Sequence, residues 1–391
     1  MSTLRNSLRV QLVLLTFVRM LVSTAFRMVY PFLPIFRDAL NVPLETLTRA
    51  VGLRSLVSAF AAPFLATVGD TRGRRAGIVL GLSVFILGVA VVSFWPTFGG
   101  FTIAMILMLM GKATFDPSLQ AYIGDRVPYA QRSAAITVTE FSWSGAFIFG
   151  VPAMGWVLGR AGWLAPFQLL GLMVLVCVLA VLWTMRAQGA ARHPEAKSAF
   201  GNFKVVLKSS SARMVLLLTL FTCTANELVA LTFGVWLELS FGLQLAALGA
   251  AAAVLGIAEF SGEGLVALIT DRLGKRRAIL IGLLVNSAAC IAMPVFGGSY
   301  AGALITLFLF YVSFEFVIVS SIPLMTEVLP AARATMMSGF VTFASIGRAI
   351  ASLLAPVLFA QGFGFNTGAA IAFNLLALWS LRSVSVAGEN Q

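Results

Sequence analysis

The chain has 391 residues, of which 59% are hydrophobic and 11% charged, and its formal net charge at pH 7 is +12. Soluble proteins contain roughly 45–50% apolar and roughly 25% charged residues, so this composition excludes a soluble globular domain. Most charges lie in short loops beside apolar runs, which is typical of a membrane protein and argues against a nucleic-acid partner.

A helix needs about 20 mostly apolar residues to cross the hydrocarbon core of a bilayer. Twelve segments have this length, which predicts an all-α integral membrane protein with twelve transmembrane helices. The first apolar run is too long for the core of a cleavable signal peptide. The predicted spans are residues 8–36, 46–69, 76–95, 99–123, 133–158, 164–185, 212–237, 245–270, 278–297, 300–325, 334–358 and 364–382.

A polar stretch separates the sixth and seventh spans and contains His193, the only histidine. It predicts an N-terminal six-helix bundle of residues 1–186, a cytoplasmic linker of residues 187–211 and a C-terminal six-helix bundle of residues 212–391.

The basic residues predict the orientation of these spans. An even number of spans puts both termini on one side, and most of the 27 Lys and Arg residues fall in loops on that side. Only Arg37, Arg49 and Arg160 fall on the opposite side. The positive-inside rule therefore places both termini in the cytoplasm, and we expect a multi-pass protein of a cell inner membrane.

Two basic turns repeat along the chain. Asp70–Arg75 (DTRGRR) joins spans two and three, and Asp271–Arg276 (DRLGKR), 201 residues later, joins spans eight and nine. Gly81 matches Gly282 at the same offset. A repeat of this period in an apolar chain predicts two related bundles in tandem, which is the organisation of many secondary transporters.

The two turns resemble the loop signature of the major facilitator superfamily (MFS), G-x-x-x-D-R-x-G-R-R, although Ala66, Thr71 and Ala267 depart from it. The resemblance implies the twelve-helix MFS fold, most like the drug-exporter type of proton antiporter. In the family this loop latches the two halves in one conformation; the alternative is that its charges only fix the topology. The latch residues implied are Asp70, Arg74, Arg75, Asp125, Arg132, Asp271, Arg272 and Lys275.

Two further motifs carry the same resemblance. Residues 125–132 (DRVPYAQR), between spans four and five, are echoed by residues 327–333 (EVLPAAR), between spans ten and eleven. Residues 150–155 (GVPAMG) in span five are similar to an exporter-associated Gly-Pro motif but are incomplete.

Ionisable side chains inside spans usually face the bundle interior or a hydrated cavity. They are mainly basic in the first half and mainly acidic in the second: Arg19, Arg27, Arg54, Lys112, Asp116 and Glu140, then Glu227, Glu259, Glu263, Glu315 and Arg348. Spans one, four, seven and ten line the central cavity in this family. The resemblance therefore implies a substrate site of Arg27, Lys112, Asp116, Asn226, Glu227 and Glu315.

Some of these charges have simpler interpretations. Lys112 and Asp116 are spaced i, i+4 on one helix and could form a static pair. Arg19 and Arg54 could lie near the membrane surface and extend their charged ends into the polar region.

A proton-coupled carrier needs a carboxyl group whose protonation changes during the transport cycle, and burial disfavours the charged form of such a group. Glu227 is the first candidate, followed by Glu315 and Asp116. Glu259 and Glu263 share a helix face and are further candidates, since two close carboxylates disfavour each other's ionisation.

The repeat, the charges within the spans and the family resemblance together predict a secondary active transporter that works by alternating access and is coupled to protons. The resemblance alone implies that it exports a small amphipathic compound. We expect a monomer in contact with membrane lipids, with no cofactor and no metal, and no enzyme, since the chain lacks H-E-x-x-H, G-x-S-x-G and P-loop patterns. One alternative is a transporter of an anionic or zwitterionic solute or a lipid-like molecule, favoured by Arg27 and Lys112. Another is a non-transporting assembly or receptor protein.

Overall fold

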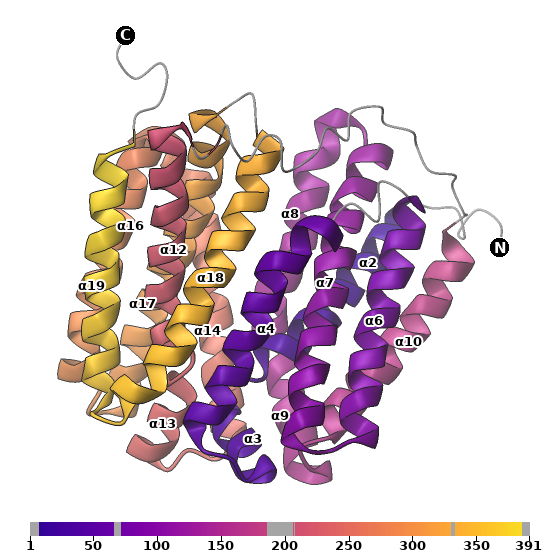
Figure 1. Cartoon of the computed structure of the whole chain (residues 1–391), viewed down its shortest axis with the longest axis horizontal. Helices are drawn as coiled ribbons and strands as arrows, with labels where there is room; N and C mark the ends of the chain where they lie inside the picture. The colour runs from indigo at the N-terminus through magenta and orange to yellow at the C-terminus, as the bar shows by residue number, and fades with distance from the viewer. Residues whose placement is uncertain (1–7, 66–71, 186–205, 207, 330–332, 385–391) are drawn as a thin grey trace. The chain divides into compact units, whose positions relative to one another are not determined.

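The structure is a computed structural model that describes residues 8–65, 72–185, 206, 208–329 and 333–384. All regular elements in these ranges are helices (Figure 1). In the first half they are α2 (Leu8–Arg27), α3 (Leu33–Leu40), α4 (Leu44–Leu65), α6 (Arg74–Phe94), α7 (Phe98–Arg126), α8 (Tyr129–Gly145), the π-helical turn η1 (Ala146–Gly150), α9 (Val151–Ala161) and α10 (Ala165–Thr184). In the second half they are α12 (Ser210–Ala230), α13 (Phe233–Phe241), α14 (Leu245–Leu265), the π-helical turn η2 (Val266–Thr270), α15 (Asp271–Leu273), α16 (Lys275–Phe296), α17 (Tyr300–Val328), α18 (Arg333–Phe359) and α19 (Phe363–Arg382).

Eleven helical segments within the described residues are long and apolar enough to cross a membrane. The remaining predicted span corresponds to α4, which carries Glu45, Arg49 and Arg54. The predicted all-α membrane fold is therefore confirmed, with the count of spans close to the predicted twelve.

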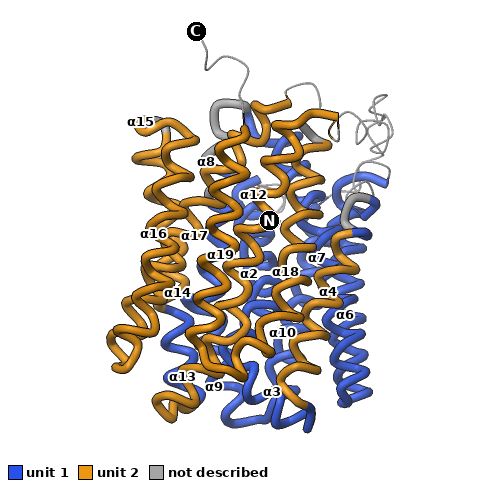
Figure 2. Tube along the Cα trace, turned by 60° about the vertical axis from the view of Figure 1, so that its left-hand side comes forward, with its two compact units in different colours: residues 1–42, 60–195, 245–253 blue, residues 43–59, 196–244, 254–391 orange. Residues whose placement is uncertain are grey.

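The chain divides into two compact units (Figure 2). Unit 1 consists of residues 1–42, 60–195 and 245–253, and unit 2 consists of residues 43–59, 196–244 and 254–391. Each unit takes one short segment from the opposite half of the sequence. The bundle boundaries drawn from the sequence stay a prediction.

The internal repeat is visible in the backbone at the ends of helices. Gly73 has φ 92° and Gly274 has φ 80°, so both basic turns use the left-handed conformation that glycine adopts most readily. The helices α3 and α13 also end alike, at Asn41 with φ 51° and Gly242 with φ 61°. These pairs lie 201 residues apart, as the repeated turns do.

The predicted span over residues 8–36 is wrong as a continuous helix. The helix α2 ends at Arg27 and α3 begins at Leu33. The proline ring at Pro31 clashes with the carbonyl four residues earlier, which belongs to Arg27, and it removes a backbone donor. The second half has a matching break between α12 and α13, where Thr232 Oγ1 donates to the Leu228 carbonyl at 2.9 Å.

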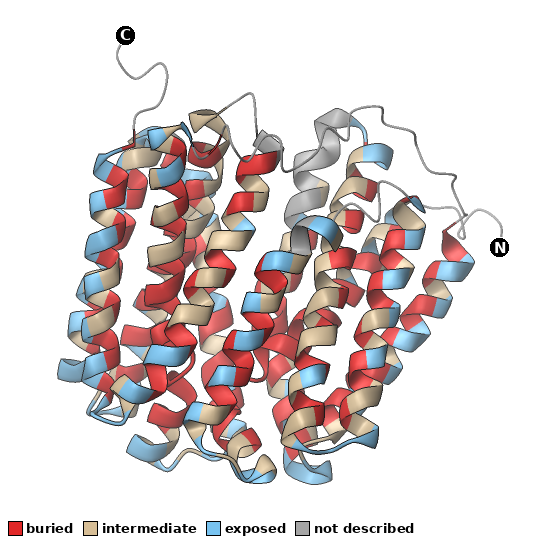
Figure 3. Ribbon diagram, viewed as in Figure 1, coloured by how far each residue is buried: buried red, intermediate tan, exposed pale blue. Residues whose placement is uncertain are grey.

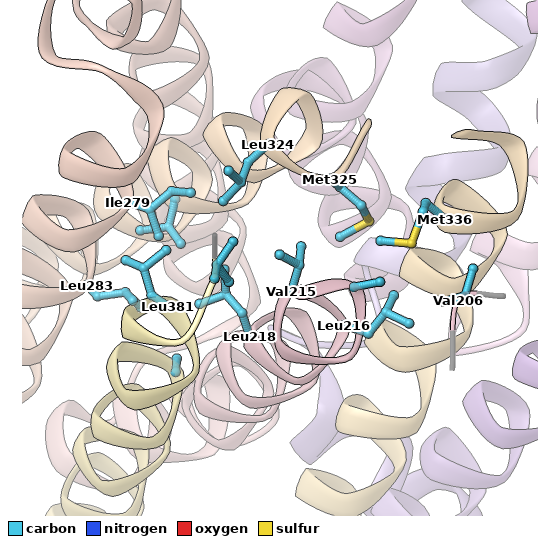
Figure 4. Packing of buried hydrophobic residues seen from close by; sticks show 14 residues of the cluster. Val206, Val215, Leu216, Leu218, Ile279, Leu283, Leu324, Met325, Met336 and Leu381 are labelled. Atoms are coloured by element: carbon cyan, nitrogen blue, oxygen red, sulfur yellow. The ribbon is translucent and has the colours of Figure 1, made fainter. Parts of the chain in front are cut away.

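Unit 2 has a buried apolar cluster that ties its helices together (Figure 4). Lipid tails are as apolar as these side chains, so close packing rather than the hydrophobic effect holds helices together inside a membrane. Buried and exposed residues occupy different faces of most helices (Figure 3). The cluster draws on α12, α16, α17, α18 and α19 and includes Val215, Leu216, Leu218, Ile279, Leu283, Leu324, Met325, Met336 and Leu381.

The helices α6 and α7 of unit 1 approach closely at two glycines. A Cβ atom at Gly111 would lie 2.5 Å from the Gly81 carbonyl oxygen and 2.8 Å from the Phe85 nitrogen. A Cβ atom at Gly81 would lie 2.6 Å from the Gly111 oxygen. Backbone meets backbone here, so neither neighbour can move aside as a flexible side chain would.

We expect Gly111→Ala to destabilise the protein by about 1–3 kcal/mol, since the added methyl group forces α6 and α7 apart. The matched control is Gly124→Ala in the same helix, where a Cβ atom would meet nothing within 4 Å. Both changes gain similar helix propensity, so the difference between their melting temperatures reports the contact. Equal melting temperatures for the two variants would contradict this packing.

Candidate functional site

Arg19 on α2 binds two carboxylates from two other helices of unit 1. Its Nε lies 3.3 Å from Asp116 Oδ1 on α7. Its Nη1 lies 2.9 Å from Glu140 Oε1 on α8, and its Nη2 donates to Glu140 Oε2 at 3.0 Å. Nη1 also donates to the Thr139 carbonyl at 2.9 Å. The prediction that Arg19 extends toward the membrane surface is wrong, because its side chain is 9% exposed and its guanidinium joins three helices.

Lys112 and Gln120, one turn before and after Asp116 on α7, complete this group. Lys112 Nζ lies 2.6 Å from Asp116 Oδ2 and donates to Ser23 Oγ on α2 at 3.4 Å. Gln120 Nε2 donates to Glu140 Oε1 at 2.8 Å. The i, i+4 pair expected from the sequence is therefore present, but it belongs to a larger network. Sequence reasoning counted Arg19 and Glu140 among the charges and missed them as site residues. We call Arg19, Lys112, Asp116, Gln120 and Glu140 the Arg19 network.

Arg27, at the end of α2, stacks on aromatic rings of span five. Its guanidinium carbon lies 3.6 Å from the centroid of Phe147 and 4.3 Å from that of Trp143. Its Nη1 donates to the Trp143 carbonyl at 3.1 Å. Lys112 Nζ lies 5.6 Å from the same indole ring. The structure thus brings Arg27 and Lys112 to one aromatic side chain, which stabilises both cations through its ring face.

Span five is built from α8, η1 and α9. Pro152 lies at the start of α9 and lacks a backbone donor, so the regular i→i−4 bonding is interrupted where η1 widens the helix. A Cβ atom at Gly150 would lie 2.0 Å from Thr24 Oγ1, and one at Gly155 would lie 2.6 Å from the ring of Phe32. The two glycines of the GVPAMG motif therefore allow span five to pack closely against the segment around span one.

Glu227 on α12 is the central acidic group of unit 2. It is 2% exposed, and Arg348 Nε on α18 lies 3.9 Å from its Oε2. Thr224 Oγ1, one turn earlier on α12, donates to the Gly347 carbonyl at 3.2 Å, which holds α12 against α18 at this level. Asn226 is 8% exposed, and its buried Oδ1 accepts no hydrogen bond from the described residues.

The other predicted carboxylates of unit 2 lie on α14 and α17. Glu315 is 7% exposed and acts electrostatically on the buried thiol of Cys223, as Glu227 and Arg348 do. A Cβ atom at Gly262 would lie 2.8 Å from Glu315 Cβ, so α14 packs against α17 at Gly262. This glycine lies between Glu259 and Glu263 in the sequence. Glu259 is 3% exposed. Unit 2 thus brings its predicted acidic residues to neighbouring positions on three helices.

The basic turns make equivalent contacts within each unit. Arg74 Nε lies 2.8 Å from Asp125 Oδ2, and Lys275 forms an ion pair with Glu327 in unit 2. Arg75 Nη2 donates to the Leu182 carbonyl at 2.9 Å, near the end of α10. The first residue of the first latch, Asp70, lies outside the described residues, as do the side chains of Arg132 and Asp271. Arg272 is exposed, and the latch function stays a prediction.

The described residues contain no group of three or more His, Cys, Asp or Glu side chains that could hold a metal ion. Cys177, Cys223 and Cys290 are buried free thiols.

Comparison with known proteins decides the family. Two overlapping segments, residues 15–352 and 215–387, match the sequence profile of the Major Facilitator Superfamily. The chain belongs to this superfamily. It is similar to three proteins of Bacillus subtilis (strain 168) in particular, and two of these are uncharacterised MFS-type transporters.

The first, YwfA, is 26% identical over 267 residues, which is 68% of this chain and 65%, just under two thirds, of YwfA. The second, YceJ, is 23% identical over 96% of both chains. Multidrug resistance protein 2 is 22% identical over 72% of both chains. A crystal structure of a D-xylose–proton symporter matches the fold with a TM-score of 0.75 at 14% identity, covering 94% of this chain and 96% of the symporter. The chain is thus an MFS transporter and a multi-pass membrane protein.

We expect Arg19→Met in this MFS transporter to destabilise the protein by about 1–3 kcal/mol, because Asp116 and Glu140 lose the cation that they share, although Asp116 keeps Lys112. The control is Arg49→Met, since the side chain of Arg49 is 60% exposed and pairs within α4 with Glu45. An exposed pair of this kind contributes about 0–1 kcal/mol. Thermal unfolding of both purified variants measures the difference in stability. Similar melting temperatures would rule out a large contribution of Arg19 to the stability of the folded protein.

Proposed function

We propose that this protein is a proton-coupled secondary transporter that exports a small amphipathic compound by alternating access. The bacterial inner membrane, cytoplasmic termini and a monomeric state belong to the same proposal. The observation that carries it is the Arg19 network, in which two carboxylates and two cations lie on three predicted spans of unit 1. Ionisable groups inside a membrane are rare and usually mark substrate or proton pathways.

The carboxylates supply the proton coupling in this proposal. Glu227, Glu315 and Asp116 lie on helices assigned to spans seven, ten and four. Glu227 and Glu315 are buried, and the side chain of Asp116 is 24% exposed. Glu227 is the first candidate, because it is 2% exposed and lies next to Asn226 on a predicted cavity-lining span. Glu259 and Glu263 are the next candidates.

Export and an amphipathic substrate are supported by similarity and by side-chain chemistry. Multidrug resistance protein 2 is named for resistance, which is consistent with outward movement. The rings of Trp143 and Phe147 pack against Arg27, and the partly exposed Trp143 also lies beside Lys112. A substrate with an apolar body and a polar end fits this combination, as ligand sites are mostly apolar with a few placed polar groups.

A second candidate is transport of an anionic or zwitterionic solute, or of a lipid-like molecule. The observation that favours it is the pair of cations at the Trp143 ring, since a guanidinium and an ammonium recognise carboxylate or phosphate groups. In this case Arg27 contacts the head group of the substrate.

Thermal stability of the purified protein in the presence of a compound panel separates these candidates. A ligand that binds the folded state raises the apparent melting temperature. Stabilisation by lipophilic cations that is lost in Glu227→Gln supports the first proposal, and stabilisation by organic anions or lysolipids that is lost in Arg27→Ala supports the second.

Transport in proteoliposomes tests proton coupling directly. We expect an imposed pH gradient to drive a stabilising compound across the membrane, and Glu227→Gln to abolish this flux while the protein still folds. Unchanged pH dependence in the variant would remove Glu227 as the coupling residue. No flux of any panel compound would favour a non-transporting assembly or receptor role.

A further inference from the structure

We infer that Glu140 is a proton-accepting group of the transport cycle, and that Arg19 is the positioning residue that divides its charge between Glu140 and Asp116. This inference rests on the proposed transport function. It adds a carboxylate from span five to those on spans four, seven and ten.

The two carboxylates of the Arg19 network have unequal surroundings. Asp116 contacts two cations, Lys112 at 2.6 Å and Arg19 at 3.3 Å. Glu140 contacts one cation, Arg19, and accepts from the neutral amide of Gln120. Each added cation favours the charged form of a carboxylate. Two cations therefore hold the charged form of Asp116, whereas one cation holds that of Glu140.

The exposure of the two side chains also favours Glu140 as the carboxylate that a proton can reach. The side chain of Glu140 is 41% exposed, whereas that of Asp116 is 24% exposed. The closest neighbours of α8 are α2, α7 and η1. Glu140 contacts Arg19 from α2 and Gln120 from α7. The other charged groups of the network, Lys112 and Asp116, lie on the same helix α7 and pair with each other, while η1 (AFIFG) carries no charged residue. No second cation in these contacts replaces Arg19 as the partner of Glu140.

Charge balance gives the consequence of proton uptake. Arg19 and Lys112 carry two positive charges, and Asp116 and Glu140 carry two negative charges. A proton from water forms an O–H bond on Glu140 and changes its charge from −1 to 0. Arg19 keeps Asp116 and the Thr139 carbonyl as partners, but its ion pair with Glu140 becomes a hydrogen bond from a cation to a neutral carboxyl group, which lacks the attraction between opposite charges. The connection from α8 to α2 weakens, while that from α7 to α2 remains.

The first measurement needs no substrate. Purified full-length protein is titrated with acid while infrared spectroscopy follows the carbonyl band of protonated carboxyl groups. We expect a band in the wild type that is missing in Glu140→Gln and present in Glu45→Gln, a control that removes an exposed, ion-paired carboxylate on α4. An unchanged titration in Glu140→Gln would overturn the inference.

The positioning role of Arg19 is tested with Arg19→Lys, which keeps the charge but lacks the planar fork that spans two carboxylates. We expect the pH at which the Glu140 band appears to move in this variant and to stay constant in Arg49→Lys. No movement would overturn the role of Arg19. Melting temperatures of all variants establish that they are folded.

Transport then separates this inference from the proposed function. The probe is tetraphenylphosphonium, a lipophilic cation, in proteoliposomes. We expect Glu140→Gln to lose uptake driven by a pH gradient and to retain exchange without a gradient. Loss of both with a normal fold, or retention of both, would overturn Glu140 as a coupling group. If the wild type moves no probe at all, the proposed export of lipophilic cations fails, and the infrared titration still decides whether Glu140 accepts a proton.

Discussion

The sharing of one guanidinium between two carboxylates is the interaction on which the candidate site depends. An ionised carboxylate taken out of water must find a cation and hydrogen-bond donors, or it becomes neutral. Arg19 meets that requirement for two carboxylates at once because its planar fork donates in several directions. Without Arg19, Asp116 would keep Lys112 as a cation partner, whereas Glu140 would keep the neutral amide of Gln120. The two carboxylates therefore depend on Arg19 to different degrees.

The scaffold repeats itself, but the charges within the spans do not. Each unit has a basic turn that contains a positive-φ glycine, and the basic residue after this glycine pairs with a carboxylate near the end of another long helix: Arg74 with Asp125, and Lys275 with Glu327. The helices α7 and α17 also begin alike, with Thr97 and Ser299 as N-caps that accept from Gly100 and Gly302. In contrast, unit 1 holds a compact network of matched charges and unit 2 holds Glu227 opposite Arg348 at 3.9 Å. The repeat therefore explains how the helices are built, whereas the chemistry differs between the units.

Most of the fold was predictable because its signals are local. Span lengths follow from apolar runs of about 20 residues, and the repeat follows from matching turn residues. The break after Arg27 was also encoded locally, in Pro31, but the high apolar content of residues 8–36 concealed it. The Arg19 network was not predictable, since Arg19 lies 97 residues from Asp116 and 121 from Glu140. The charge of each of these residues and the span that holds it can be predicted from the sequence. The rotation of one helix against another cannot, and this rotation decides which charged side chains come into contact.

Span five combines two kinds of contact that respond differently to a proton. Its second part, α9 and the end of η1, packs against the segment around span one through Gly150 and Gly155, where the lack of a side chain permits close approach. These contacts carry no charge and are independent of pH. Its first part, α8, is connected to α2 and α7 through Glu140, whose strength as a partner depends on its protonation. The π-helical turn η1 separates the two parts and interrupts the regular backbone bonding. A change of charge at Glu140 therefore acts on the contacts of α8, whereas the close glycine contacts of α9 and the end of η1 do not depend on it.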